Sequence, residues 1–187
     1  IIFKPTSPLK IFNQKTIQSK LVLKEQQRLL LQTWDSFNKG LLPANKLFDY
    51  DKMAIFYAVV DLFGGHHAYL DSNMHLYFNP VTNLIEPIGR ELDGLRYSHN
   101  STTMLTYNNQ QDLTQIKLFQ DRDFLQKYFY HLDKITKTDY LDQFFKSIKV
   151  DMQEKMSILH NDYPFYAYPV EFLYQNQKTI RSKLNQS

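Results

Sequence analysis

Polar side chains between residues 66 and 96 follow an order that suits phosphoryl transfer. Asn73 comes after a Gly-Gly break and a polar loop, and Asp93 comes 20 residues later (93 − 73), after two short apolar segments. Mg²⁺ prefers hard oxygen ligands and usually takes only one or two from protein, the others coming from phosphate and water. One amide oxygen and one carboxylate at the two ends of a hairpin therefore predict a magnesium site.

Candidate catalytic groups lie close to Asn73 in the sequence. Asp71 is two residues before Asn73, within reach of a substrate hydroxyl that it would orient or deprotonate. The adjacent His66 and His67 open the polar loop. Together with Asp71 or His75 they allow a second hypothesis, a zinc or iron site in a metal-dependent hydrolase, although no His-x-x-x-His helix pattern supports it.

Each of these residues also has a purely structural interpretation. Asn73 and Asp93 are residue types that favour turns, and Asp93 is followed by glycine. Asp71 fits a solvated loop carboxylate. Of the two adjacent histidines, one would be hydrogen-bonded inside the fold and the other exposed. The spacing by itself leaves the chemical and the structural interpretations open.

The apolar pattern predicts the elements that must hold these residues. A helix capped by Asp49 or Asp51 is apolar almost all round, so we expect it to be buried, and Gly64-Gly65 ends it. Residues 74–78 and 84–88 then flank a five-residue turn, which predicts a β-hairpin. The polar residues 96–113 predict a surface loop.

The remaining pattern is helical. Residues 1–16 predict an extended entry segment and residues 17–23 a short strand, followed by a helix that ends near Gly40. Three helices are expected in the C-terminal part; their predicted starts are Asp121 or Asp123, Thr138 or Asp139 with continuation to Leu159, and Pro169. The fold class predicted is mainly α with a small β-hairpin, in a single domain over residues 17–187.

Composition excludes several function classes. The chain has 187 residues, a net charge of +3 and no basic stripe, which argues against nucleic-acid binding. It has no cysteine, so disulfides, thiolate metal sites and thiol nucleophiles are excluded. No apolar run approaches the ~18 residues that a transmembrane helix needs. Its five glycines form no phosphate-cradling loop, while 13 Tyr and 14 Phe predict a core of large rings.

The region 48–96 resembles the spore-coat protein H (CotH) kinase family, which has an atypical protein-kinase-like fold. The resemblance covers about 50 residues well and most of the chain loosely. It rests on these segments: Asp49-Tyr50-Asp51, Asp61-Leu62-Phe63-Gly64-Gly65, Asn73-Met74-His75-Leu76-Tyr77-Phe78-Asn79-Pro80, Leu84-Ile85-Glu86-Pro87-Ile88, Asp93-Gly94, and Phe172-Leu173 with Ile180-Arg181 and Leu184.

The resemblance implies roles for particular residues. Asn73 matches the metal-binding Asn of the catalytic loop, and Asp93 the metal-binding Asp after the hairpin. The family usually has an Asp about five residues before that Asn, where this chain has Ala68, so Asp71 or His67 is the candidate base. A second departure is the Arg-Glu-Leu sequence at 90–92, where the family more often has an apolar approach.

The resemblance also implies an activity. The chain would be the helical C-terminal lobe of a CotH-like kinase that uses Mg²⁺ and ATP to phosphorylate a protein hydroxyl, for example on a coat or secreted protein. Secretion, a cell surface or a spore coat is the implied location. Ile1 is not Met, and we expect a longer protein whose ATP-clamping strands precede Ile1, so that the isolated lobe is nearly inactive. The alternative is a non-catalytic coat or surface assembly module that keeps the family shape.

Overall fold

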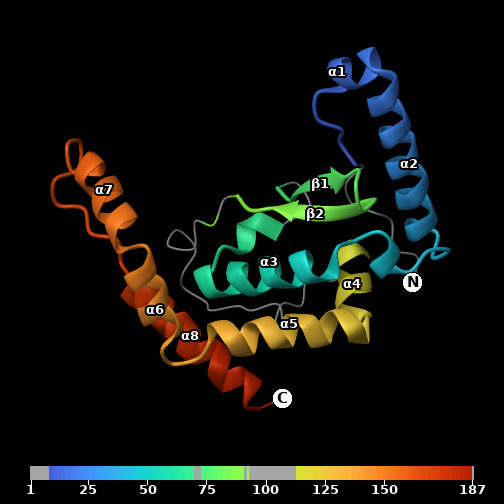
Figure 1. The fold of residues 1–187 in the computed structure, drawn as a ribbon. Coiled ribbons are helices and arrows are strands. Elements are labelled where there is room, and N and C mark those ends of the chain that lie inside the picture. Colours follow the sequence, from blue (N-terminus) through green and yellow to red (C-terminus); the bar gives the residue numbers. More distant parts are fainter. Residues whose placement is uncertain (1–8, 70–72, 91, 93–112, 187) are drawn as a thin grey trace.

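The computed structural model describes residues 9–69, 73–90, 92 and 113–186. In these ranges the chain is mainly helical and contains one two-stranded antiparallel sheet (Figure 1), which confirms the predicted fold class. The elements are α1 (Gln14–Ser19), α2 (Leu21–Asn38), the 3₁₀ turn η1 (Ala44–Lys46), α3 (Tyr50–Phe63), the 3₁₀ turn η2 (His66–Tyr69), β1 (His75–Asn79), β2 (Leu84–Ile88), α4 (Leu113–Gln120), α5 (Arg122–Ile135), α6 (Tyr140–Ser147), α7 (Lys149–Leu159) and α8 (Glu171–Leu184).

Helix α3 is the centre of the fold because it is apolar on almost every side. Of the two predicted caps, Asp49 and Asp51, the first caps the helix, since the Asp49 side chain accepts a hydrogen bond from the Lys52 amide at 3.1 Å. Helix α5 packs along α3, while α8 and the β-hairpin cover other sides of it (Figure 1). The buried positions of α3 are Tyr50, Met53, Ala54, Tyr57, Ala58, Val60, Asp61 and Leu62.

Large rings fill the space between α3, α4 and α5, as the composition predicts. Phe119 of α4 lies edge-on to Tyr57, Phe124 and Tyr128, with ring centroids 5.1–5.2 Å apart. Edge-to-face pairs of this kind add to the free energy gained by burying the rings. The three helices are therefore held in register by one aromatic cluster.

Two phenol–carboxylate hydrogen bonds also join α3 to α5. Tyr50, at the start of α3, donates to Asp121 at 2.6 Å, and Asp121 caps the first turn of α5. Further along, the buried Tyr128 of α5 donates to the buried Asp61 of α3. Both helices consequently begin at the same end of the molecule and run in the same direction.

The hairpin is antiparallel, with His75 opposite Ile88 and Asn79 opposite Leu84. Asn83 adopts a left-handed conformation (φ 57°) in the turn, a conformation that Asn tolerates better than most residues. The predicted strands and the turn are thereby confirmed, with the boundaries of the first strand and the turn shifted by one residue.

The residues just before α3 hold the hairpin in place. Ile85 of β2 donates its amide to the Leu47 carbonyl at 2.7 Å and accepts from the Asp49 amide at 3.0 Å. Lys52 of α3 reaches Glu86 of β2 at 2.7 Å. Hydrogen bonds from Lys52 and then from Asn79 lower the pKa of the Glu86 carboxyl. The hairpin therefore starts from a fixed position against α3.

Later elements close the ends of earlier helices. Lys117 of α4 donates to the Phe37 and Asn38 carbonyls at the end of α2, at 2.6 and 3.2 Å. Gln177 of α8 donates to the carbonyl of Ile135, the last residue of α5, at 3.1 Å and to that of Lys137, two residues later, at 2.9 Å. Helices α2 and α5 thus end at positions fixed by residues 40 to 80 positions away in the sequence.

The predicted strand at 17–23 is wrong, because this segment belongs to α1 and α2. Leu21 and Val22 are 76% and 68% exposed, and no strand lies beside them within the described residues. A strand without a hydrogen-bonding neighbour leaves its backbone unpaired, whereas a helix satisfies its backbone internally. The extended segment predicted over residues 1–16 is also wrong in its last three residues, because α1 begins at Gln14. Residues 1–8 of that segment lie outside the described residues.

The single helix predicted from Thr138 or Asp139 to Leu159 is divided into α6 and α7. Ile148 leaves the helical conformation (φ −101°, ψ 7°), but the apolar spacing continues across this one-residue bend, so the sequence pattern does not locate it. The Asp139 side chain does not cap α6 and accepts instead from Gln143 at 2.5 Å.

Leu113, the last residue of the predicted loop, begins α4; the rest of that loop lies outside the described residues. None of the described helices combines the length and apolarity needed to cross a membrane.

We predict that Tyr128→Phe lowers the free energy of unfolding by about 1–3 kcal/mol, because a buried charge-assisted hydrogen bond to Asp61 is lost without a change in shape. Urea denaturation followed by circular dichroism measures the effect. Tyr130→Phe is the matched control, since Tyr130 is 64% exposed and its hydroxyl should contribute little. Equal stabilities of the two variants would contradict the assigned role of Tyr128.

The free energy of unfolding should also fall at alkaline pH. Burial first, and the neighbouring carboxylates second, raise the pKa values of Tyr50 and Tyr128 above the ordinary value of 10.0. The folded protein then keeps protons that the unfolded chain releases, so this stability is complete below pH 10.0 and declines above it. Denaturation curves recorded from neutral to strongly alkaline pH check this. The double variant Tyr50→Phe, Tyr128→Phe should lose stability less steeply; an equally steep loss would assign the effect to other groups.

Candidate functional site

The candidate site begins where α3 ends. Gly64 takes the left-handed conformation (φ 64°) that closes a helix, and the Gly65 amide donates to the Val60 carbonyl at 3.0 Å. Asn176 of α8 donates to the Leu62 carbonyl at 3.0 Å. These contacts fix the direction in which the chain leaves α3.

The turn η2, which carries His67, is held from two sides. The Ala68 amide donates to the Gly65 carbonyl at 2.9 Å. The buried Gln115 of α4 donates to the Tyr69 carbonyl at 2.5 Å. Ala68 and Tyr69 are themselves 2% and 0% exposed. The backbone around His67 is thus a packed platform.

His67 and Asn73 lie in contact. Asn73 Nδ2 is 3.0 Å from His67 Nδ1 and 2.9 Å from Nε2, and it also donates to the His67 carbonyl at 3.3 Å. A neutral imidazole accepts through one of these ring nitrogens, according to its tautomer. Because the Asn73 amide nitrogen faces His67, the amide oxygen points in another direction. Amide oxygens can act as ligands of hard cations such as Mg²⁺.

The two ends of the hairpin are tied together beside Asn73. One nitrogen of His75, Nδ1, lies 2.8 Å from the Asn73 carbonyl, and the other, Nε2, lies 2.6 Å from Arg90 Nη1. A neutral ring protonated on Nδ1 would donate to Asn73 and accept from Arg90. His75 therefore links the start of β1 to the segment that follows β2.

The backbone of Leu92 lies directly against Gly65. A Cβ atom added to Gly65 would be 2.9 Å from Leu92 Cα and 3.2 Å from its Cδ2. Real Cβ atoms do not approach other heavy atoms so closely, so the absence of a side chain at position 65 is what lets the two segments touch. The chain thus returns to the end of α3 at the residue that precedes Asp93.

The predicted site residues can now be located. His67 and Asn73 are brought together, both half-buried. Asp71 and Asp93 lie outside the described residues, so their predicted roles remain predictions. His66 belongs to η2, but its side chain is likewise outside the description.

No group of three or more His, Asp or Glu residues that could bind a metal ion occurs in the described part of the chain. The hydrolase hypothesis needs the His66 side chain and Asp71, neither of which is described, and it stays a prediction. A magnesium site of one amide and one carboxylate does not need three such residues.

Sequence reasoning missed the residues that support this site. Gln115 lies 46 positions from its partner Tyr69, and it carries no local signal of this role. Arg90 was noticed only as a departure from a family pattern. The Gly64-Gly65 pair, in contrast, was a visible signal, because consecutive glycines after an apolar helix indicate a sharp exit.

Comparisons of the chain with protein-family models, with curated proteins and with solved structures found no match. The interpretation of the site therefore depends on its own geometry and on the resemblance of its residues.

We predict that Gly65→Ala destabilises the fold by about 1–3 kcal/mol, since the added Cβ overlaps the Leu92 backbone and forces a shift. Chemical denaturation measures the loss. Gly89→Ala is the matched control, because nothing lies within 4 Å of a Cβ at that glycine. A Gly65→Ala variant as stable as Gly89→Ala would show that the two segments are not in close contact in solution.

Proposed function

We propose that this chain is the C-terminal lobe of a CotH-like atypical kinase, which transfers the γ-phosphoryl group of ATP to a protein hydroxyl. The observation that carries the proposal is the meeting of three segments at the end of α3. The Asn73 amide faces His67, and the Leu92 backbone, one residue before Asp93, lies against Gly65.

Asn73 and Asp93 are proposed to hold Mg²⁺. The contacts of the Asn73 amide nitrogen with His67 orient its oxygen away from the ring. The hairpin brings the chain back to Gly65 just before Asp93. When bound, Mg²⁺ would neutralise charge on the transferred phosphoryl group, and the protein contributes by positioning.

His67 or Asp71 is proposed to orient or deprotonate the substrate hydroxyl. Ala68, at the position where the family usually has an Asp, is 2% exposed, so this position faces the core. The half-buried His67 is held by η2 on one side and by Asn73 on the other. Histidine is a residue type that commonly acts as a general base.

The alternative proposal is a non-catalytic assembly module with the same shape. Its supporting observation is again Ala68, since a buried methyl group at that position provides no base. In this case the His67–Asn73 contact would only stabilise the loop.

Nucleotide binding and phosphate transfer by the full-length protein separate these proposals. We predict that Asn73→Ala and Asp93→Ala each reduce Mg²⁺-dependent transfer from radiolabelled ATP on the order of a hundredfold, because each removes a ligand that stabilises the charge of the transition state. His67→Ala should reduce transfer while nucleotide binding, measured by calorimetry, is retained.

Matched controls come from the exposed turn after α7. Asn161→Ala and Asp162→Ala remove the same two side-chain types at exposed positions and should leave transfer unchanged. If Asn73→Ala and Asp93→Ala behave like these controls, the kinase proposal is wrong and the assembly proposal is supported. Denaturation curves for every variant distinguish lost chemistry from lost folding.

A further inference from the structure

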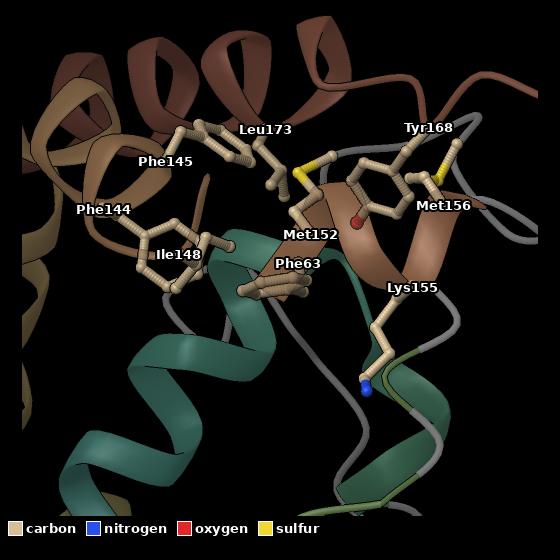
Figure 2. A pocket seen from close by; sticks show the side chains of 9 residues that line it. All are labelled: Phe63, Phe144, Phe145, Ile148, Met152, Lys155, Met156, Tyr168 and Leu173. Atoms are coloured by element: carbon tan, nitrogen blue, oxygen red, sulfur yellow. The ribbon is translucent and has the colours of Figure 1, made fainter. Parts of the chain in front are cut away.

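Apolar side chains line an open groove of about 230 Å³ beside α7 (Figure 2). It lies where the end of α3 meets α6, α7 and α8. Phe63 of α3, Phe145 of α6 and Leu173 of α8 are among its lining residues. The groove is separate from the His67–Asn73 site, because none of its lining residues belongs to η2 or to the hairpin.

Three other lining residues form an unusual stripe along and just before α7. Met152 and Met156 are four residues apart on one face of α7, and Ile148, at the bend four residues before Met152, lines the same groove. All three are only half-buried, and α7 has no buried residue. An apolar helical stripe normally packs against a partner. This one borders space that the described side chains leave open.

The polarity of the groove indicates what would fill it. The described residues that line it are almost entirely apolar and provide two polar groups, the Tyr168 hydroxyl and the Lys155 ammonium. An extended peptide would leave backbone N–H and C=O groups there without hydrogen-bond partners. An alkyl chain has no such groups along its length and needs a polar partner only at its end.

Lys155 provides that partner. Among the described residues it is the only charged one that lines the groove, and Figure 2 shows its amine pointing away from the aromatic rings. Its neighbour Glu154 lies 3.2 Å from the amine, but both side chains are more than 60% exposed and such a pair is weak. Burial raises the pKa of Tyr168, which keeps that hydroxyl a neutral donor.

We propose that the α7 groove binds a medium-chain fatty acid, with its alkyl chain against Met152 and Met156 and its carboxylate at Lys155. Methionine suits this role because its flexible, polarisable side chain adapts to the shape of an apolar ligand. The proposal does not depend on the kinase function.

Calorimetric titration of the 187-residue chain with acetate, hexanoate, octanoate and decanoate, below their micelle concentrations, tests the proposal. We expect Kd to fall by about fourfold for each added methylene until the groove is full. In spectra of the methyl-labelled protein, the Met152 and Met156 signals should shift with octanoate while that of the buried Met53 stays in place. No dependence on chain length, or shifts spread equally over all three methyl groups, would overturn the proposal.

Variants test the two halves of the site separately. Met152→Trp should fill the groove and abolish binding, whereas Val150→Trp, at a position 75% exposed and outside the groove, should not. Lys155→Ala should raise Kd by about two- to fivefold and abolish the preference for octanoate over octylamine, with Lys149→Ala as control. Equal binding of octanoate and octylamine by the unmodified chain would overturn the carboxylate assignment. Self-association that Met152→Trp abolishes would instead assign the groove to a contact between two copies of this chain.

Discussion

The burial of α3 is the constraint on which the other parts of this structure depend. A helix that is apolar on nearly all sides is stable in water only if other elements cover each side. Helix α5, the hairpin and α8 do so, and each is placed by the side of α3 that it covers. The candidate catalytic site and the α7 groove both lie at the C-terminal end of this helix. In the candidate catalytic site Gly65 contacts Leu92, and in the α7 groove Phe63 is a lining residue.

The fold is closed by side chains that donate to distant backbone carbonyls. Lys117 and Gln115 of α4 reach the end of α2 and η2, and Asn176 and Gln177 of α8 reach the ends of α3 and α5. Carbonyls at helix ends have no partner inside the helix, so these contacts satisfy groups that burial would otherwise leave unpaired. They also determine where the chain leaves each helix, and through η2 they position His67.

Local signals were sufficient for several parts of the fold. The Asp49 and Asp121 caps, the apolar pattern of α3, Gly64-Gly65 and the paired strands all depend on residues close in sequence, and all were predicted correctly within a residue or two. The short strand expected at 17–23 failed, because alternating polarity alone cannot show whether a neighbouring strand exists. The bend at Ile148 was missed, since the apolar spacing continues through it.

The sequence by itself determined a mainly helical chain with one hairpin and a polar loop after a buried helix, because helix caps, periodicity and turn residues act over a few positions. It also singled out Asn73 and His67 as candidates, but not that they touch. Only the tertiary structure decided that contact, the approach of Leu92 to Gly65 and the groove beside α7. Each of these three features joins segments whose relative position depends on which elements cover α3. That coverage depends on contacts between side chains far apart in the sequence, which local patterns do not reveal.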